Sequence, residues 1–132
     1  MRTIEIHTRA HTQMINITAR VQDEVRAAGL TEGLCCVYVP HTTAGVFINE
    51  GADPSVMEDV RDTFDRLVPW NGSYRHTEGN AAAHVKATIV GESVTVIVRN
   101  GQLRLGTWQA IFFAEFDGPR HRTVWIGTVP AT

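Results

Sequence analysis

Apolar residues alternate with polar ones at the start of the chain and then change to a helical spacing. In residues 2–8, Ile4 and Ile6 lie on one face of an extended segment, which predicts a β-strand. In residues 18–28 the apolar positions recur at three- and four-residue intervals, which predicts a helix that ends at Gly29. The chain therefore opens with a strand followed by a helix.

Two further strands are expected before the second helix. Residues 34–39 read LCCVYV, a continuous apolar run that is typical of a strand buried on both faces. Cys35 and Cys36 would then be core residues of this strand. After the polar turn HTTAG, residues 46–49 predict a second, shorter strand.

The second helix has the clearest boundaries in the sequence. Asp53 is a favourable N-cap residue, Pro54 suits the first helical position, and Pro69 ends the segment. The apolar positions of this helix form one stripe: Val56, Val60, Phe64 and Leu67.

After a polar loop, residues 80–90 predict a short third helix with Asn80 as its cap. A strand is the alternative for the last three residues of this segment.

The last third of the chain is predicted to be β-structure. An Asn-Gly pair at 100–101 separates residues 93–98 from residues 102–105, which is typical of a hairpin. Residues 108–116 and 123–129 predict two more strands, joined by an Asp-Gly-Pro turn.

The strand at residues 108–116 is apolar on both faces, and Glu115 is its only charged residue. Such a strand lies either between two layers of one chain or against another subunit. A chain of 132 residues with modest helix content has little material to cover both faces, so we expect a homo-oligomer.

Length and composition limit the classes of protein that are expected. A chain of 132 residues with 43% hydrophobic and 20% charged residues is typical of one globular domain. The net charge of −2 argues against a general nucleic-acid-binding protein. No apolar run reaches the ~20 residues of a membrane span, so neither nucleic acid nor a membrane is an expected partner.

The two cysteines and the first residues of the chain favour a cytoplasmic location. Cys35 and Cys36 are neighbours whose side chains point to opposite faces of a strand, so a disulfide between them would be strained. The opening sequence MRTIEIHTRAHTQ lacks the apolar centre of a secretory signal. Both features fit a reducing compartment.

Three histidines are candidates for one site. His41 follows an apolar strand, and His76 and His84 frame the start of the third helix, where Asn80 and His84 lie one turn apart. Three converging neutral imidazoles suit zinc or a similar divalent ion, although the spacing matches no named zinc motif. Independent turn, capping and surface histidines are the alternative.

Charged residues elsewhere offer acid–base and anion-binding groups. Glu50 ends an apolar strand and is a candidate general base or metal ligand. Arg120 and Arg122 alternate in DGPRHR, so both guanidinium groups could clamp one phosphate or carboxylate. A solvated turn with an Asp117–Arg120 pair is the alternative.

The segment LGTWQ offers groups that recognise a planar heterocycle. Trp108 is a candidate for stacking and Gln109 for amide hydrogen bonds, with a core tryptophan as the alternative. The P-loop, Rossmann, nucleophile-elbow and HExxH motifs are missing, so those chemistries have no support in the sequence.

Five sequence blocks, taken in order, resemble the YjbQ-like family of small bacterial and archaeal proteins, which are described as secondary thiamine-phosphate synthases. Together the blocks cover nearly the whole chain. They are HTTAG from His41, INEGADPSV from Ile48, His76 with GNAAAH ending at His84, LGTWQ from Leu105, and EFDGPRHR from Glu115.

The resemblance implies a single α+β domain over residues 1–132, with a β-sandwich-like fold and two to three helices, that assembles as a homotrimer. It also implies that His41, His76 and His84 gather with Glu50 near a subunit boundary and hold a divalent metal ion, zinc or magnesium, or an anion. The implied reaction joins hydroxymethylpyrimidine diphosphate to thiazole phosphate and releases pyrophosphate, so the expected ligand is a small phosphorylated heterocycle.

Under this hypothesis each candidate residue has a role. The metal ion, with Arg120 and Arg122, neutralises the leaving pyrophosphate. Trp108 stacks on the pyrimidine and supports its cationic methylene carbon. Asn80 and Gln109 orient the two rings.

Two other functions stay open. One is a binding module that holds a metal-bound phosphorylated metabolite without chemistry. The other is a metal-dependent hydrolase in which Glu50 acts as base on a metal-bound water.

Overall fold

The computed structural model describes residues 1–132 and has α+β architecture. The first half of the chain forms β1 (Arg2–His7), β2 (Gln13–Asn16), α1 (Thr18–Ala27), β3 (Glu32–Tyr38), β4 (Ala44–Glu50) and α2 (Pro54–Leu67). The second half forms α3 (Ala81–Val90), β5 (Ser93–Arg99), β6 (Gln102–Leu103), β7 (Gln109–Glu115) and β8 (His121–Pro130).

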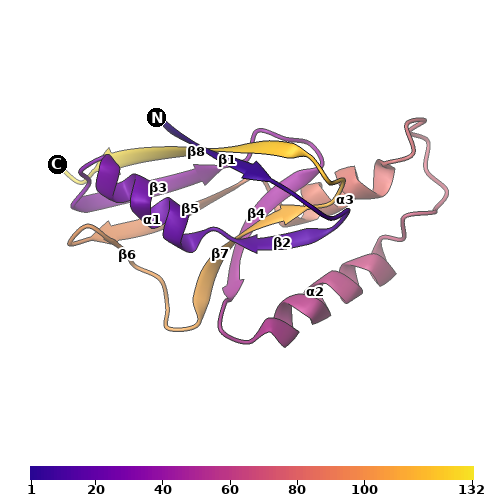
Figure 1. The fold of residues 1–132 in the computed structure, drawn as a ribbon, viewed down its shortest axis with the longest axis horizontal. Helices are drawn as coiled ribbons and strands as arrows, with labels where there is room; N and C mark the ends of the chain where they lie inside the picture. Colours follow the sequence, from indigo (N-terminus) through magenta and orange to yellow (C-terminus); the bar gives the residue numbers. More distant parts are fainter.

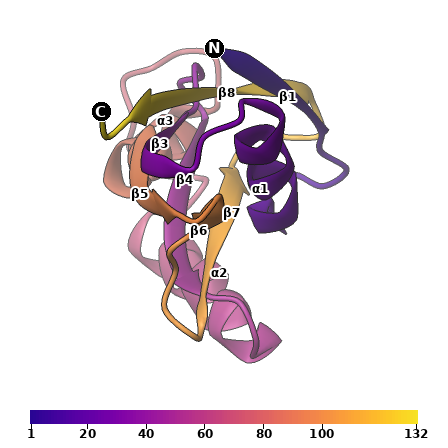
Figure 2. The same ribbon diagram turned by 90° about the vertical axis from the view of Figure 1, so that its left-hand side faces the viewer.

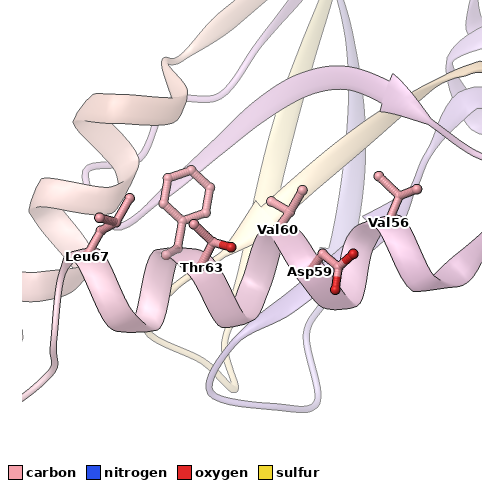
Figure 3. A pocket seen from close by; sticks show the side chains of 6 residues that line it. Val56, Asp59, Val60, Thr63 and Leu67 are labelled. Atoms are coloured by element: carbon pink, nitrogen blue, oxygen red, sulfur yellow. The ribbon is translucent and has the colours of Figure 1, made fainter.

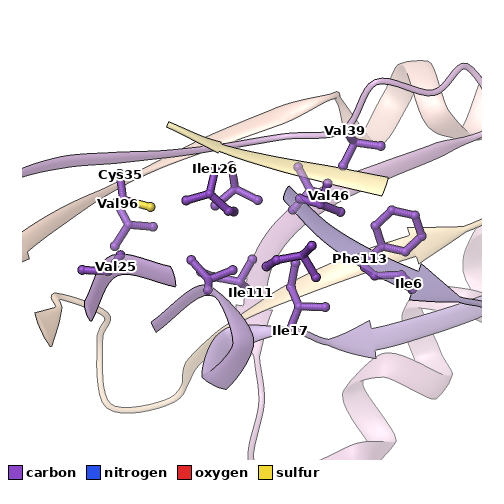
Figure 4. Packing of buried hydrophobic residues seen from close by; sticks show 14 of the residues in the cluster. Ile6, Ile17, Val25, Cys35, Val39, Val46, Val96, Ile111, Phe113 and Ile126 are labelled. Atoms are coloured by element: carbon purple, nitrogen blue, oxygen red, sulfur yellow. The ribbon is translucent and has the colours of Figure 1, made fainter. Parts of the chain in front are cut away.

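The strands form two antiparallel sheets that face each other across one core (Figure 1 and Figure 2). One sheet has the order β1-β8-β3-β5-β6 and the other the order β2-β7-β4. A cluster of 17 buried residues, most of them from the two sheets, fills the space between them (Figure 4). Val21 and Val25 of α1 belong to this cluster, so α1 covers part of the core.

The strand β7 is buried on both faces by layers of its own chain. Ile111 and Phe113 point into the core between the sheets. On the opposite face Ala114 packs with Ala83 and Ala87 of α3. The two-sided apolar pattern therefore marks a central strand, and it does not by itself argue for a second subunit.

The expectation that β3 is buried on both faces is wrong. Cys35 and Val37 face the core, but Leu34, Cys36 and Tyr38 are exposed on the other face. Although β3 is hydrogen-bonded to β5 and β8 on its two sides, no layer covers this outer face. Cys36 is therefore a surface residue, whereas burial and the neighbouring Cys36 raise the pKa of the Cys35 thiol to about 11.

The exposed side chains of β3 continue onto its neighbours. Leu34 lies opposite Ile97 and Val129, both 61% exposed, and Tyr38 stacks on Trp125 with the ring centroids 5.7 Å apart. Contiguous exposed apolar surface of this kind typically marks an interaction site. We call this surface the outer apolar face; it comprises Leu34, Tyr38, Ile97, Trp125 and Val129.

The boundaries expected for α2 are confirmed. The Asp53 side chain accepts a hydrogen bond from the Ser55 amide at 3.0 Å, and Pro54 is the first helical residue. The helix extends beyond the two sheets, and none of its residues is buried (Figure 1 and Figure 2). Its apolar stripe lines an open groove of about 320 Å³, with Val56, Val60 and Leu67 along one side of the helix (Figure 3).

The β5–β6 turn and the end of helix α3 are as follows. Asn100 and Gly101 have φ values of 53° and 73°, as the tight β5–β6 hairpin requires. Helix α3 continues to Val90 and ends at Gly91, so the strand alternative at its end is not adopted. Asn80 occupies the cap position of α3, but its side chain makes no capping hydrogen bond.

Both cysteines are free. No helix in the structure combines the length and apolar character that crossing a membrane requires.

Candidate functional site

Two of the predicted site residues meet where the β3–β4 turn approaches α3. His41 precedes β4, and His84 lies in α3, so the packing of α3 on β4 brings them to one open pocket of about 360 Å³. Pockets of ~300–1,000 Å³ are typical of small-molecule sites. The residues that line it are His41, Thr42, Ala44, His84, Ala87, Thr88 and Glu92.

The imidazole of His41 is held by the backbone of β8. Its Nε2 atom lies 3.0 Å from the Thr123 amide nitrogen and 3.2 Å from the Thr123 carbonyl oxygen. The amide donates to Nε2 when the ring proton is on Nδ1, and Nε2 donates to the carbonyl when the proton is on Nε2. In the second tautomer, Nδ1 has a free lone pair for a ligand.

The pKa of His41 is lowered from its ordinary value. Burial is the largest cause because it penalises the charged ring, and the positive charge of Arg122 acts in the same direction. The contact with the Thr123 backbone and the charge of Glu115 oppose this shift without outweighing it. His41 is therefore neutral at neutral pH and can act as a base or ligand.

His76 reaches the site only through His84. Their ring centroids are 5.1 Å apart in an edge-to-face arrangement. His41, His76 and His84 do not bring their ligand atoms within 4.8 Å of one another as a set of three. Within one chain, therefore, His41 and His84 line the pocket, and His76 contacts the ring of His84 without lining the pocket. The three histidines do not form a three-ligand metal centre.

Asn80, Asp117 and Arg120 form a connected group one helical turn before His84. Asp117 Oδ2 accepts hydrogen bonds from Asn80 Nδ2 and from Arg120 Nη2, each at 2.9 Å. Burial raises the pKa of Asp117, but the two hydrogen bonds, together with the charges of Arg120 and His11, outweigh it and hold the pKa below its ordinary value. The Asn80 Oδ1 atom is buried and has no hydrogen-bond partner, which is unusual for a buried polar atom.

The predicted clamp of Arg120 and Arg122 is not formed. Arg120 is exposed and takes the alternative arrangement, the pair with Asp117, whereas Arg122 is 5% exposed and pairs with Glu115. Arg122 Nε donates to Glu115 Oε1 at 2.8 Å, and Nη2 donates to Thr43 Oγ1 at 2.8 Å. The reason is that Arg122 lies in β8 and faces the interior, while Arg120 precedes the strand.

Glu115 is the centre of a buried polar network. Its side chain is fully buried and also accepts hydrogen bonds from Thr8 Oγ1 at 2.8 Å and from the Asp117 amide at 3.0 Å. Burial alone raises the pKa of Glu115, but the hydrogen bonds from Arg122, Asp117 and Thr8, together with the charge of Arg122, outweigh it and lower the pKa. The network fixes the β7–β8 turn beside the pocket.

Glu50, Trp108 and Gln109 lie at the opposite end of the β4–β7 pair. Glu50 is six residues along β4 from Ala44, which corresponds to about 20 Å of strand. Its carboxylate accepts from the Ala52 amide at 2.7 Å, and Gln109 Oε1 accepts from the Gly106 amide at 2.8 Å. Trp108 is 65% exposed.

The predicted site is thus divided within one chain. The end of β4 that carries the histidines also has the Asn80–Asp117–Arg120 group, and the far end has the indole, an amide and a carboxylate. Trp108 and Gln109 line a second pocket of about 280 Å³, together with Gly51 and Ala52 after Glu50.

Comparison with known proteins decides the family. A family model described as "UPF0047 protein YjbQ-like" matches residues 2–131. The chain belongs to the YjbQ/UPF0047 family. Among curated members, it is 50% identical to the UPF0047 protein YugU of Bacillus subtilis over 127 residues, with 96% of each chain covered. It is 44% identical to the UPF0047 protein MJ1081 of Methanocaldococcus jannaschii over 122 residues, which cover 92% of this chain and 88% of that one.

Two solved structures share the fold. A family member from Clostridium acetobutylicum matches with a TM-score of 0.96 and 44% identity, over 98% of this chain and all of the other (100%). The protein APE1520 of Aeropyrum pernix matches with a TM-score of 0.93 and 40% identity, over 98% and 97% of the two chains. Family and fold are therefore established for this chain.

The sequence alone did not predict several residues of this candidate site. Thr42, Thr88 and Glu92 line the histidine pocket, but ordinary polar residues near a turn and on a helix carry no distinctive signal. The partner of Arg122 did have a signal, because Glu115 is a lone charge in an apolar strand and a buried carboxylate requires a partner.

Proposed function

We propose that this protein is a thiamine-phosphate synthase of the secondary type, acting as a cytoplasmic homotrimer. The reaction breaks the C–O bond between the pyrimidine methylene carbon and the diphosphate, and the departing oxygen keeps the bonding electrons. The thiazole nitrogen supplies the electron pair of the new C–N bond. The family resemblance supports the reaction, and the two free cysteines agree with a reducing compartment.

The observation that carries the proposal is the division of the candidate groups between two ends of the β4–β7 pair. The histidine end offers imidazoles and the Arg120 guanidinium, which suit a diphosphate. The far end offers the exposed Trp108 ring and the Gln109 amide, which suit flat heterocycles. The reaction needs both sets at one place, and a second copy of the chain can bring its far end to the histidine end of the first.

A closed ring of copies is the assembly that this division favours. Contact between two different surfaces is heterologous, so every copy is satisfied only when the ring closes, as in a trimer. The outer apolar face and the groove along α2 are two apolar surfaces that contacts between copies would remove from water. These surfaces, and not β7, are the support for oligomerisation.

Residues at the histidine end have distinct proposed roles. Arg120 exchanges its pair with Asp117 for oxygens of the diphosphate and stabilises the charge that develops there. The unpaired Asn80 Oδ1 accepts a hydrogen bond from the exocyclic amine of the pyrimidine. Arg122 does not contact substrate; it positions the β7–β8 turn and helps to keep His41 neutral.

A divalent metal ion fits the donor set of the pocket, and zinc fits it better than magnesium. His41 and His84 offer imidazole nitrogens, which zinc prefers, whereas magnesium prefers oxygen ligands. These two residues would hold the ion, and His76 would orient His84 through their ring contact. When bound, such an ion supplies positive charge to the leaving diphosphate.

Mixing two inactive variants tests the proposal. We expect His84→Ala and Trp108→Ala each to lose formation of thiamine phosphate from the two precursors. If the site lies between subunits, unfolding and refolding an equimolar mixture restores about a quarter of the wild-type activity, because random assembly leaves about one interface in four with both native residues.

The matched control is a mixture of His84→Ala with Arg120→Ala. Both changes affect the same half of the site, so no interface regains a complete set and no activity returns. Wild-type protein that forms no thiamine phosphate would overturn the proposed reaction. Inactive single variants whose refolded mixture also recovers no activity, from a wild-type protein that is active after the same refolding, would instead overturn the shared site.

A binding module is the second candidate, favoured by the open pocket and by the existing pair of Arg120 with Asp117. It predicts saturable binding of a phosphorylated heterocycle with no release of pyrophosphate. The hydrolase alternative has less support, since Glu50 lies at the far end and its carboxylate is occupied by backbone amides. It predicts phosphate release from a single substrate.

A further inference from the structure

Three metal-ligating side chains meet on the edge ribbon formed by β1 and β8, outside the site described above. The antiparallel register places His7 directly opposite His121 and Glu5 opposite Thr123. Because alternate residues of a strand share a face, Glu5 lies on the same face as His7. None of these three residues lines the pocket of His41 and His84.

The spacing of their ligand atoms suits one metal ion. One ligand atom from each of Glu5, His7 and His121 lies within 4.8 Å of the other two. His121 Nε2 is 3.4 Å from Glu5 Oε2, and the two imidazole centroids are 4.1 Å apart. Two ligand atoms of a tetrahedral zinc ion with bonds of ~2.0–2.1 Å are themselves about 3.3 Å apart. Small rotations of exposed side chains are therefore enough to close the site.

The backbone that carries these side chains is fixed from inside. Thr8, next to His7, donates through its hydroxyl to Glu115 and accepts from the Arg120 amide, both at 2.8 Å. Arg122, next to His121, is locked by its buried pair with Glu115. Thr8 and Arg122, the neighbours of His7 and His121 in the chain, thus belong to one buried network around Glu115. This network fixes the strands that carry the two imidazoles.

We propose that Glu5, His7 and His121 form a second metal site that binds Zn²⁺ or a similar borderline divalent ion. Two imidazoles and one carboxylate are a donor set that zinc uses when one coordination position stays open. All three residues are exposed, so water or a small anion can take that position. Magnesium and calcium, which prefer oxygen ligands, do not fit two nitrogen donors.

Zinc titration of tag-free protein, followed by calorimetry, tests the proposal. To separate the two sites, the reference protein is His76→Ala/His84→Ala, in which the candidate pocket has lost two imidazoles. This reference is expected to bind one zinc ion per chain through the β1–β8 site. Adding His7→Ala and His121→Ala is expected to weaken that binding more than about tenfold, since it removes two of three ligands.

Two further measurements keep the result decisive. Circular dichroism of the four-fold variant checks folding, which exposed positions should not disturb. Cobalt(II) reports geometry, because a visible absorption of tetrahedral type should appear in the reference and be lost in Glu5→Gln. Equal zinc affinity in the reference and the four-fold variant, or a cobalt spectrum unchanged by Glu5→Gln, would overturn the site and leave only the Glu5–His121 ion pair.

Discussion

Two arginine–carboxylate pairs flank the β7–β8 turn, and burial gives them different properties. Arg122 and Glu115 lie in the interior, with relative exposures of 5% and 0%. Arg120 and Asp117 lie in the turn itself, each two residues from its counterpart in the inner pair, and meet at 2.9 Å with the arginine in solvent. The inner Arg122–Glu115 pair is fixed by burial, whereas the exposed Arg120 guanidinium of the outer pair can exchange Asp117 for another anion. Groups of the same chemistry therefore have different environments because of the position at which β8 begins.

Removing the inner arginine should have the largest effect on stability. Arg122→Met leaves the Glu115 carboxylate buried without its main partner, and breaking a buried pair in this way typically costs about 3–5 kcal/mol. Arg120→Met, the matched control, removes an exposed pair and should change the free energy of unfolding by less than about 1 kcal/mol. Urea unfolding of both variants measures the difference.

The comparison can be sharpened with Arg122→Met/Glu115→Leu. Replacing both charges by apolar groups removes the unpaired carboxylate, so stability should return toward the wild-type value. Equal losses in Arg122→Met and Arg120→Met would show that burial does not distinguish the two pairs.

Acid should weaken the inner pair next. The folded-state pKa of Glu115 lies below its ordinary value of 4.5, so below that pH the unfolded chain binds protons more readily than the folded protein. The stabilising effect is therefore complete above about pH 4.5 and is lost as the pH falls toward the folded-state pKa. Asp117 contributes in the same sense below its ordinary value of 3.8.

Unfolding free energies measured across this pH range test the prediction. In Arg122→Met the lone buried carboxyl favours its protonated form, so its folded-state pKa should lie above the ordinary value of 4.5. Stability should then rise as the pH falls toward about 4.5, which reverses the dependence on pH seen in the wild type. A variant whose acid sensitivity matches that of the wild type would contradict this account of Glu115.

Local signals in the sequence were enough to predict the elements around the site. The Asp53 cap, the Asn100-Gly101 turn and the apolar stripe of α2 act through neighbouring residues, so the sequence reveals them directly. The run LCCVYV misled because continuous apolar character does not say what covers the second face. In β3 nothing within the chain covers it.

The assembly of the site could be predicted only in part, because it depends on register. His41 and His84 lie far apart in the chain and meet because α3 packs on β4. The two arginines differ because β8 starts at His121, two residues earlier than expected, which turns Arg122 inward opposite Ile6. Neither fact follows from spacing along the chain, since strand starts and helix docking are set by the whole core.

The outer arginine should have the smallest effect on stability and a decisive one on function. Arg120→Ala removes a solvent-exposed pair, so the unfolding free energy should stay within about 1 kcal/mol of the wild-type value. Formation of thiamine phosphate should nevertheless be lost, since no other exposed guanidinium belongs to the Asn80–Asp117 group. A steady-state activity assay and urea unfolding of one preparation measure the two effects separately.

Because Asp117 loses its cationic partner in Arg120→Ala, Asp117→Asn is the control for disturbance of the turn itself. If Arg120→Ala turns over substrate like the wild type, Arg120 has no part in the reaction, and the outer pair is only a feature of the surface.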